Sequence, residues 1–247
     1  MLELKNIHKS FGEREILSGV NLKLEKGNVY TLMGANGTGK TTIFNIVTSF
    51  LKADEGTVLF KGKRIDNLSP VTINSLGITR TFQNLRLIEG LSVKENILLA
   101  FKGNKGERIW NALLPGIFLK EEKADYEQKA KEIIRKVFLD DVADSKAGEI
   151  SYGQQKLLTF ACCIANDAEL LLLDEPVAGI NPEYRNKIKN LVLHLKANGK
   201  TILLIEHNTE FIEQLSDRLF FLNSGLLMKF ENYDALKNNT IVHEAYL

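Results

Sequence analysis

The residues best suited to chemistry lie in a glycine-rich segment, Gly34–Thr42, which directly follows the apolar run Val29–Met33. The pattern G-x-x-x-x-G-K-[ST], between an expected strand and an expected helix, is typical of loops that bind nucleotide phosphates. Glycines let successive backbone N–H groups converge on phosphate oxygens, because no Cβ atom obstructs the approach. Lys40 would contact the β- and γ-phosphates, and the Thr41 hydroxyl would bind Mg²⁺. The expected nucleotide contacts are Gly34, Asn36, Gly37, Thr38, Gly39, Lys40, Thr41 and Thr42.

The helix expected to begin near Lys40 supports this interpretation. The positive end of its dipole would point at the bound phosphates. Its inward face is predicted from apolar side chains at helical spacing, namely Ile43, Ile46, Val47 and Phe50. A plain strand-to-helix turn is the alternative, and the Lys-Thr-Thr sequence argues against it.

A second candidate group is a pair of acids, Asp174 and Glu175, at the end of the all-apolar run Leu170–Leu173. Burying such acids is unfavourable unless the carboxylates meet a metal or a hydrogen-bond donor. In a nucleotide site, Asp174 would bind Mg²⁺ directly or through water, and Glu175 would polarise the attacking water. After a phosphate loop, this pair favours hydrolysis over simple nucleotide binding.

A third candidate is the segment Ile150–Gln155. Ser151 and Gln154 have the spacing of a capping box, which predicts the start of a helix. The same helix N-terminus, with a serine hydroxyl and the bare backbone of Gly153, suits an anion such as a γ-phosphate. The two roles are compatible, so we expect Ser151, Gly153 and Gln154 to serve both.

The composition narrows the class of protein. The chain has 247 residues, 44% hydrophobic and 26% charged, which is typical of a globular α/β domain with a smaller subdomain. The formal net charge of +1 gives no reason to expect a nucleic-acid partner. No apolar run approaches the roughly 20 residues that span a bilayer, and the N-terminus lacks a signal-peptide core. We therefore expect a cytosolic chain whose membrane role, if any, comes through another polypeptide.

The order of the expected elements predicts the fold. The first 30 residues alternate in the strand manner, and a hairpin-like return follows 57–60. Apolar strands at 29–33, 78–82, 170–173 and 201–205 alternate with helices, which indicates a mainly parallel sheet covered on both faces. We expect a nucleotide-binding core with an antiparallel β subdomain over 1–83 and 151–230.

The remaining segments are expected to be an insertion and a tail. Residues 84–150 read as a helical subdomain, with a helix at 93–100, irregular chain at 102–120 and an amphipathic helix at 121–138. The inward face of that last helix is predicted as Ala130, Ile133, Ile134, Val137 and Phe138. Asn181-Pro182 predicts a helix start, and Asn223–Gly225 the turn of a hairpin. Residues 231–247 are expected to form a short tail.

The two cysteines, Cys162 and Cys163, are adjacent on an expected helix. Neighbouring helical positions point in different directions, so the two thiols cannot form an ordinary disulfide or a metal pair. We interpret them as small buried hydrophobic residues in a reducing compartment.

Four segments, in this order, resemble the ATP-binding subunits of ABC transporters: Gly34–Thr41, Ser151–Gln155, Leu170–Glu175 and Glu206-His207. The resemblance covers essentially the whole chain and implies the P-loop NTPase fold of that family. It implies a head-to-tail pair of subunits, either identical or related. Each Mg·ATP would lie between the phosphate loop of one subunit and the Ser151 segment of the other. Isolated subunits would then hydrolyse ATP poorly.

Three further positions resemble functional residues of that family. Phe11 resembles the aromatic residue that stacks on adenine, although an ordinary core phenylalanine is an equal alternative. Gln83 resembles the glutamine that touches Mg²⁺ or the lytic water and communicates with the membrane subunits. His207 resembles the histidine that contacts the γ-phosphate, so with Glu175, Lys40 and Gln83 it is counted among the expected catalytic residues.

Within the family, the chain most resembles the LivG-type subunits of branched-chain amino acid importers. The resemblance rests on 78–84, 151–155, 178–182, the insertion near 102–125 and the ending 242–247. It implies transmembrane permease partners, an extracellular or periplasmic solute-binding protein acting indirectly, and a place on the cytoplasmic face of the membrane. Urea importers and lipopolysaccharide-export ATPases are similar alternatives. More distant ones are a soluble ABC ATPase acting on ribosomes or DNA, and a nucleotide kinase.

The chain also departs from the family pattern. Tyr152 replaces the commoner glycine, so its ring is expected to point away from the phosphate. Asn181 stands where many relatives carry aspartate. Cys162-Cys163 replaces a frequent Arg-Ala pair, which removes a charge near the helix that follows Ser151.

Overall fold

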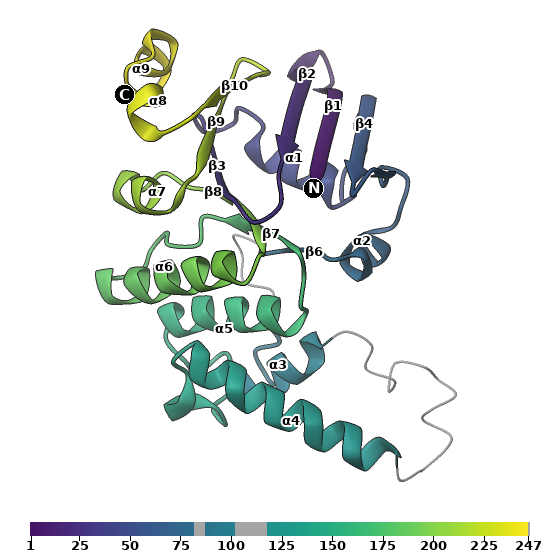
Figure 1. The fold of residues 1–247 in the computed structure, drawn as a ribbon, viewed down its shortest axis with the longest axis vertical. Helices are drawn as coiled ribbons and strands as arrows, with labels where there is room; N and C mark the ends of the chain where they lie inside the picture. Colours follow the sequence, from purple (N-terminus) through teal and green to yellow (C-terminus); the bar gives the residue numbers. More distant parts are fainter. Residues whose placement is uncertain (82–86, 102–117, 247) are drawn as a thin grey trace. The chain divides into compact units, whose positions relative to one another are not determined.

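A computed structural model describes residues 1–81, 87–101 and 118–246 of the chain. Its contacts divide the chain into two compact units, which are described separately. The first comprises Met1–Gln83, Ala168–Ala178 and Val192–Leu247, and the second comprises Asn84–Asp167 and Gly179–Leu191. Figure 1 shows the strands of the first unit and the helices of the second.

An antiparallel sheet forms the N-terminal part of the first unit. It has the order β2-β1-β4-β5. The strands are β1 (Leu2–Phe11), β2 (Arg14–Leu24), β4 (Glu55–Phe60) and β5 (Lys63–Arg64). Leu2, Leu4 and Ile7 are fully buried while Glu3 and Lys5 are not, which is the alternation of a sheet with one face in the core. This is the predicted antiparallel β subdomain.

A second sheet is mainly parallel and has the order β10-β9-β3-β8-β7-β6. Among the described strands of this second sheet, only β9 and β10 pair antiparallel. The strands are β3 (Val29–Met33), β6 (Ile78–Arg80), β7 (Leu170–Asp174), β8 (Thr201–Ile205), β9 (Arg218–Asn223) and β10 (Leu226–Phe230). Every residue of β3, β7 and β8 is buried, as expected for strands covered on both faces. The predicted α/β architecture is confirmed.

Alternate residues of β9 belong to two different cores. Phe220 and Leu222 pack in the cluster that includes the antiparallel sheet and α1 (Lys40–Val47). Leu219 and Phe221 pack instead with side chains of α7 (Thr209–Leu215), α8 (Tyr233–Lys237) and α9 (Thr240–Tyr246). The parallel sheet is therefore covered by different elements on its two faces.

The second unit is helical. It contains α3 (Val93–Ala100), α4 (Phe118–Lys136), the short 3₁₀ turn Asp140–Val142 and α5 (Tyr152–Ala165). The first half of α6 (Pro182–Ala197) belongs to it as well. The predicted subdomain ended at residue 150, whereas α5 groups with these helices because it packs on α3 and α4. No helix among the described residues is long and apolar enough to cross a membrane.

The predicted inward faces of two helices were wrong at their last positions. Phe50 and Phe138 were placed inward, yet their exposed fractions are 50% and 51%. In both places the helix ends earlier, and a residue with positive φ follows: Ser49 at 55° and Phe138 itself at 60°. The chain therefore leaves the helical periodicity before the final aromatic residue.

Four short helices were missed by the sequence analysis. They are α2 (Pro70–Leu76), α7 and the two-helix ending, α8 and α9, which replaces the expected tail. The ending is ordered by burial, because Leu236 and Val242 are fully buried against the sheet core. Their sequences are too short to show helical periodicity by themselves.

Val242→Ala tests whether α9 is part of the folded core. Removing two buried methyl groups should lower the free energy of unfolding by about 1–3 kcal/mol. Ile241→Ala is the matched control, since Ile241 is 48% exposed and should cost about 0.5 kcal/mol or less. Urea denaturation measures both. Equal effects of the two substitutions would contradict the packing of α9.

Candidate nucleotide site

A cleft of about 580 Å³ lies over the glycine-rich loop in the first unit. It is lined by Phe11, Ile16, Asn36, Gly37, Gly39, Lys40, Thr41, Thr42, Glu175 and Ile205. Phe11 is 52% exposed at this cleft, so it is not an ordinary core residue. Its ring lies beside Lys9, whose Nζ is 5.7 Å from the ring centroid. The structure thus brings the aromatic residue, the loop and one of the two acids to one cavity.

Two positions of the loop require glycine, because neighbouring atoms lie too close for a side chain. Gly34 has φ 144°, and a Cβ atom there would lie 2.3 Å from the carbonyl oxygen of Leu222. Gly39 has φ 107°, and its Cβ would lie 2.7 Å from Cγ2 of Ile16. Both the left-handed backbone and the lack of space exclude a side chain. The loop is therefore held tightly against β2 and β9.

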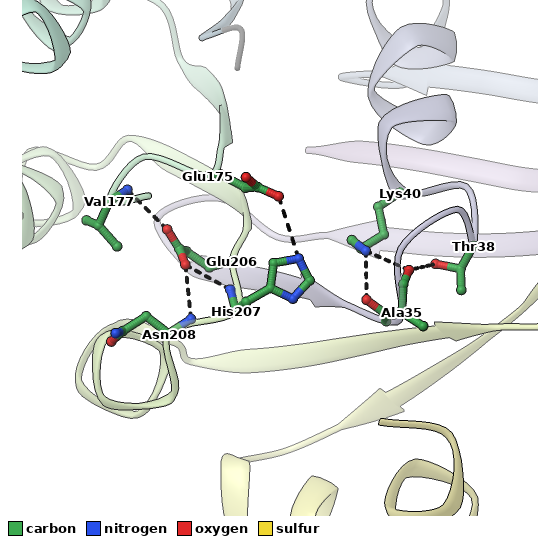
Figure 2. Close-up of polar contacts among 9 residues, drawn as sticks. Ala35, Thr38, Lys40, Glu175, Val177, Glu206, His207 and Asn208 are labelled. Carbon is green, nitrogen blue, oxygen red and sulfur yellow. Dashed lines mark hydrogen bonds and ion pairs between the residues drawn. The ribbon is translucent and has the colours of Figure 1, made fainter. Parts of the chain in front are cut away.

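Lys40 lies across the loop that it follows. Its Nζ donates to the carbonyl oxygens of Gly34 (2.7 Å) and Ala35 (2.9 Å), as Figure 2 shows for Ala35. The side chain is only 7% exposed. Burial lowers the pKa of Lys40, and the negative charges of Glu175 and Asp174 oppose that shift. The ammonium group is thus placed near both acids and among oxygen atoms at the centre of the loop.

Asp174 is paired inside the protein. Its Oδ2 accepts from Nη2 of Arg80 at 2.8 Å, and the two side chains are 5% and 4% exposed. Nη1 of Arg80 also donates to Oδ1 of Asn45 at 2.6 Å, and the guanidinium lies 5.2 Å from the Phe44 ring centroid. Thr81 Oγ1 accepts from the backbone N–H of Asp174. The donor that the buried carboxylate requires is therefore Arg80.

Glu175 has a strained backbone. Its φ is +48°, a left-handed conformation that is costly for a residue with a side chain. Its backbone N–H donates to the carbonyl oxygen of Ile205 at 2.9 Å. The side chain turns toward His207, with Oε1 3.6 Å from Nε2 of that ring (Figure 2). Two residues expected to act on the γ-phosphate and its water thus face each other.

The buried carboxylate of Glu206 joins the two loops that carry those residues. Its Oε1 accepts from the backbone N–H of Val177 at 3.1 Å. Its Oε2 accepts from the N–H groups of His207 (2.8 Å) and Asn208 (3.1 Å), as Figure 2 shows. Glu206 is 3% exposed, so these donors replace its hydration.

The Ser151 segment belongs to the second unit and begins α5 as predicted. Ser151 Oγ accepts from the N–H of Gln154, and Gln154 Oε1 accepts from the N–H of Ser151. Gly153 also has a packing role, because a Cβ there would lie 2.7 Å from the Cγ and Cδ2 atoms of the Tyr184 ring. Tyr152 lies beside Gly179 and under Lys156, whose Nζ is 5.5 Å from the ring centroid.

Other expectations from the sequence can be located as well. Asn181 caps α6, since its Oδ1 accepts from the N–H of Tyr184. Neither cysteine forms a disulfide; Cys163 is buried as expected, whereas Cys162 is only partly buried. Desolvation raises the pKa of Cys162 to about 12, which agrees with an unreactive thiol. Gln83 lies outside the described residues. No cluster of three or more His, Cys, Asp or Glu side chains that could hold a metal occurs among the residues that the structure describes.

The sequence analysis gave no role to Arg80 or to the side chain of Glu206. Each is a charged residue in or directly after an expected strand, which was the available signal. A charge in such a position needs a partner, but the sequence does not say which one. The partners are distant along the chain, 94 residues away for Arg80 and 29 for Glu206.

Comparison with known proteins decides the family. The sequence profile described as "ABC transporter" matches residues 17–178. The probable branched-chain amino acid transport ATP-binding protein LivG of Archaeoglobus fulgidus is 38% identical over 247 residues, covering 100% of this chain and 95% of the relative. The chain belongs to the ABC transporter family. Like other ATP-binding cassettes of that family, it binds nucleotide and is an ATPase.

Other relatives agree along the full length. The high-affinity branched-chain amino acid transport ATP-binding protein LivG of Escherichia coli is 32% identical, covering 100% of this chain and 97% of the relative. The ADP conformation of an ATP-binding cassette of an ABC transporter has a TM-score of 0.84 at 37% identity, covering 100% and 98% of the two chains. A dimeric cassette in a post-hydrolysis state bound to ADP and Pi has a TM-score of 0.78 at 26% identity, covering 94% and 98%.

Arg80→Met tests the buried ion pair of the cassette. It leaves Asp174 buried without its partner, so the free energy of unfolding should fall by about 3–5 kcal/mol. Adding Asp174→Asn removes the unpaired charge and should restore part of that loss. Chemical denaturation of the variants measures both effects. A double variant no more stable than Arg80→Met would contradict the pairing.

Gly153→Ala tests the packing role of the glycine in α5. The added methyl group would overlap the Tyr184 ring, so we expect a loss of about 1–3 kcal/mol in the free energy of unfolding. In a Tyr184→Ala background the same substitution should cost clearly less, because the clash is gone. Thermal or urea unfolding of the four chains measures this coupling. Equal costs in both backgrounds would show that Tyr184 is not the constraint.

Proposed function

We propose that this chain is the ATP-hydrolysing subunit of a branched-chain amino acid importer. The observation that carries the hydrolytic part is that Glu175 lines the same cleft as the glycine-rich loop and lies 3.6 Å from His207. The import part is supported by relatives named for branched-chain amino acid transport, which match over the whole chain.

The cleft suggests a role for each side chain. Phe11 stacks on adenine, and the backbone of the glycine-rich loop binds the phosphates. Lys40 exchanges its loop carbonyls for phosphate oxygens, which compensates its buried charge. Glu175 accepts a hydrogen bond from the attacking water and orients it, and His207 contacts the γ-phosphate. The residues assigned to the nucleotide in this chain are Phe11, Gly34, Asn36, Gly37, Thr38, Gly39, Lys40, Thr41 and Thr42.

The donors at the cleft suit a Mg²⁺ ion that arrives with ATP. Mg²⁺ keeps several waters and needs only one or two protein oxygens when phosphates supply the others. Thr41 lines the cleft and would bind the ion directly. Asp174 is buried and paired with Arg80, so it would act through a water, and Gln83 is the third residue assigned to the metal. The ion would neutralise phosphate charge during hydrolysis.

A second subunit would complete the site. The N-terminus of α5 presents Ser151, Gly153 and Gln154, whose capping box leaves the serine hydroxyl proton available to donate. We assign this anion site to the γ-phosphate bound by a partner cassette, identical or related, in a head-to-tail dimer. The dimeric cassette of similar fold supports this assembly.

The dimer would act on transmembrane permease subunits from the cytoplasmic face of the membrane, with a solute-binding protein acting on the permease. ATP binding closes the dimer and hydrolysis opens it. Specificity for the solute would lie with the permease and the solute-binding protein. The cassette itself contributes the energy of hydrolysis.

Reconstitution tests the assigned solute. The chain would be assembled in vesicles with the permease subunits encoded beside it and their solute-binding protein. Leucine, isoleucine or valine should stimulate ATP hydrolysis, and urea should not. Stimulation by urea alone would move the chain to a related importer, and co-purification with ribosomes instead of permease would contradict a transport role.

Glu175→Gln tests the assigned general base. The amide cannot accept the water's proton, so turnover should fall by about 10²- to 10⁴-fold while ATP binding is retained. The variant should also accumulate as a closed dimer in ATP. Phosphate release and size-exclusion chromatography measure the two effects. Near-normal turnover would remove Glu175 from this role.

A further inference from the structure

Three backbone N–H groups from two separate loops converge on the carboxylate of Glu206. One oxygen accepts from Val177, in the turn that follows Glu175. The other accepts from His207 and Asn208, at the start of the loop after β8. Figure 2 shows the carboxylate between the two chain segments. The group does not line the cleft and is 3% exposed, so it has no direct access to the nucleotide.

The same two loops are joined by a second bond. The N–H of Glu175 donates to the carbonyl oxygen of Ile205, the residue before Glu206. The turn after β7 is therefore fastened at Glu175 by a backbone bond and at Val177 by the carboxylate. This double attachment holds Glu175 in its left-handed conformation, which the chain would otherwise relax.

We infer that Glu206 is a positioning residue that sets the distance between Glu175 and His207. One oxygen fixes the backbone beside Glu175 and the other fixes the backbone of His207. The two functional side chains thus extend from segments held by a single rigid group, and their 3.6 Å separation follows from it. The inference rests on the hydrolytic roles proposed above for Glu175 and His207.

Glu206→Gln is the sharpest perturbation, because the side chain keeps its shape. A glutamine has one acceptor oxygen, and its NH₂ group must face N–H donors on the other side. One loop is therefore released while the other stays attached. Amide hydrogen exchange in the nucleotide-free chain should become faster at Val177, or at His207 and Asn208. Unchanged exchange at all three amides would overturn the inference without reference to catalysis.

Kinetics supply the functional readout. A small displacement of Glu175 or His207 from its working position should lower kcat by about 10- to 100-fold. The dissociation constant for ATP should stay near its normal value, because Glu206 lies outside the cleft. A loss of ATP binding with unchanged kcat would contradict a positioning role.

Asp217→Asn is the matched control. Asp217 is also a carboxylate that accepts from a backbone N–H, that of Val29, and from Nζ of Lys196. It ties the residue before β9 to β3 and α6 without lining the cleft. Its loss should lower stability while kcat stays close to that of the unmodified chain. If the two variants lose kcat in proportion to stability, Glu206 has only a structural role.

A double-mutant cycle with His207→Ala separates this inference from the proposed function. If Glu206 acts by placing His207 and Glu175, adding Glu206→Gln to His207→Ala should cost much less than it does alone. Fully additive losses would overturn the inference. Wild-type turnover in His207→Ala would disprove the role proposed for His207, and the inference would fall with it. Slow turnover in His207→Ala with normal turnover in Glu206→Gln would disprove the inference alone.

Discussion

The parallel register of β3, β8 and β7 is the constraint on which the site depends. Leu32 on β3 and Asp174 on β7 both pair with Ile205 on β8. The three strands therefore end at the same level, and their following loops carry the glycines of the Gly34–Thr42 segment, Glu175 and His207. A slip of one residue in either pairing would turn the side chains of a whole strand to the opposite face. Ligands of open α/β sheets bind at this carboxyl edge for the same reason.

The site also contains charged side chains that are buried. Lys40, Asp174 and Glu206 are each almost fully buried, and each has compensation of a different kind. Lys40 donates to loop carbonyls, Asp174 is paired with Arg80, and Glu206 accepts backbone N–H groups. Satisfied polar groups of this kind stiffen their surroundings, since a buried group left without a partner would be costly. Contacts within the chain therefore hold these three charged side chains in place.

Polar groups are also satisfied locally at the start of α5 in the helical unit. Ser151 and Gln154 satisfy each other's backbone N–H groups, and Gly153 makes room for the Tyr184 ring. The residues that resemble a family signature therefore also have a local reason to be there. The same motif can have a functional role and a structural role, and the contacts in the structure show the structural one.

The sequence alone determined the local parts of this protein. The glycine-rich loop, the capping box at Ser151, the cap at Asn181 and the buried strand before Asp174 follow from propensity, spacing and the steric freedom of glycine. Such features depend on neighbours along the chain, so they could be predicted. The family resemblance then implied a role for each of these segments.

The tertiary structure decided which residues far apart in the sequence come into contact. Arg80 reaches Asp174 because β6 pairs with β7, and Glu206 reaches Val177 because β7 pairs with β8. Phe11 comes to the cleft from β1, a strand of the other sheet. Phe50 and Phe138 were misplaced because helix ends depend on a single left-handed residue that propensity does not reveal. The C-terminal helical ending is ordered because Val242 is buried in the core. Long-range packing sets these outcomes, and no local pattern encodes the partner.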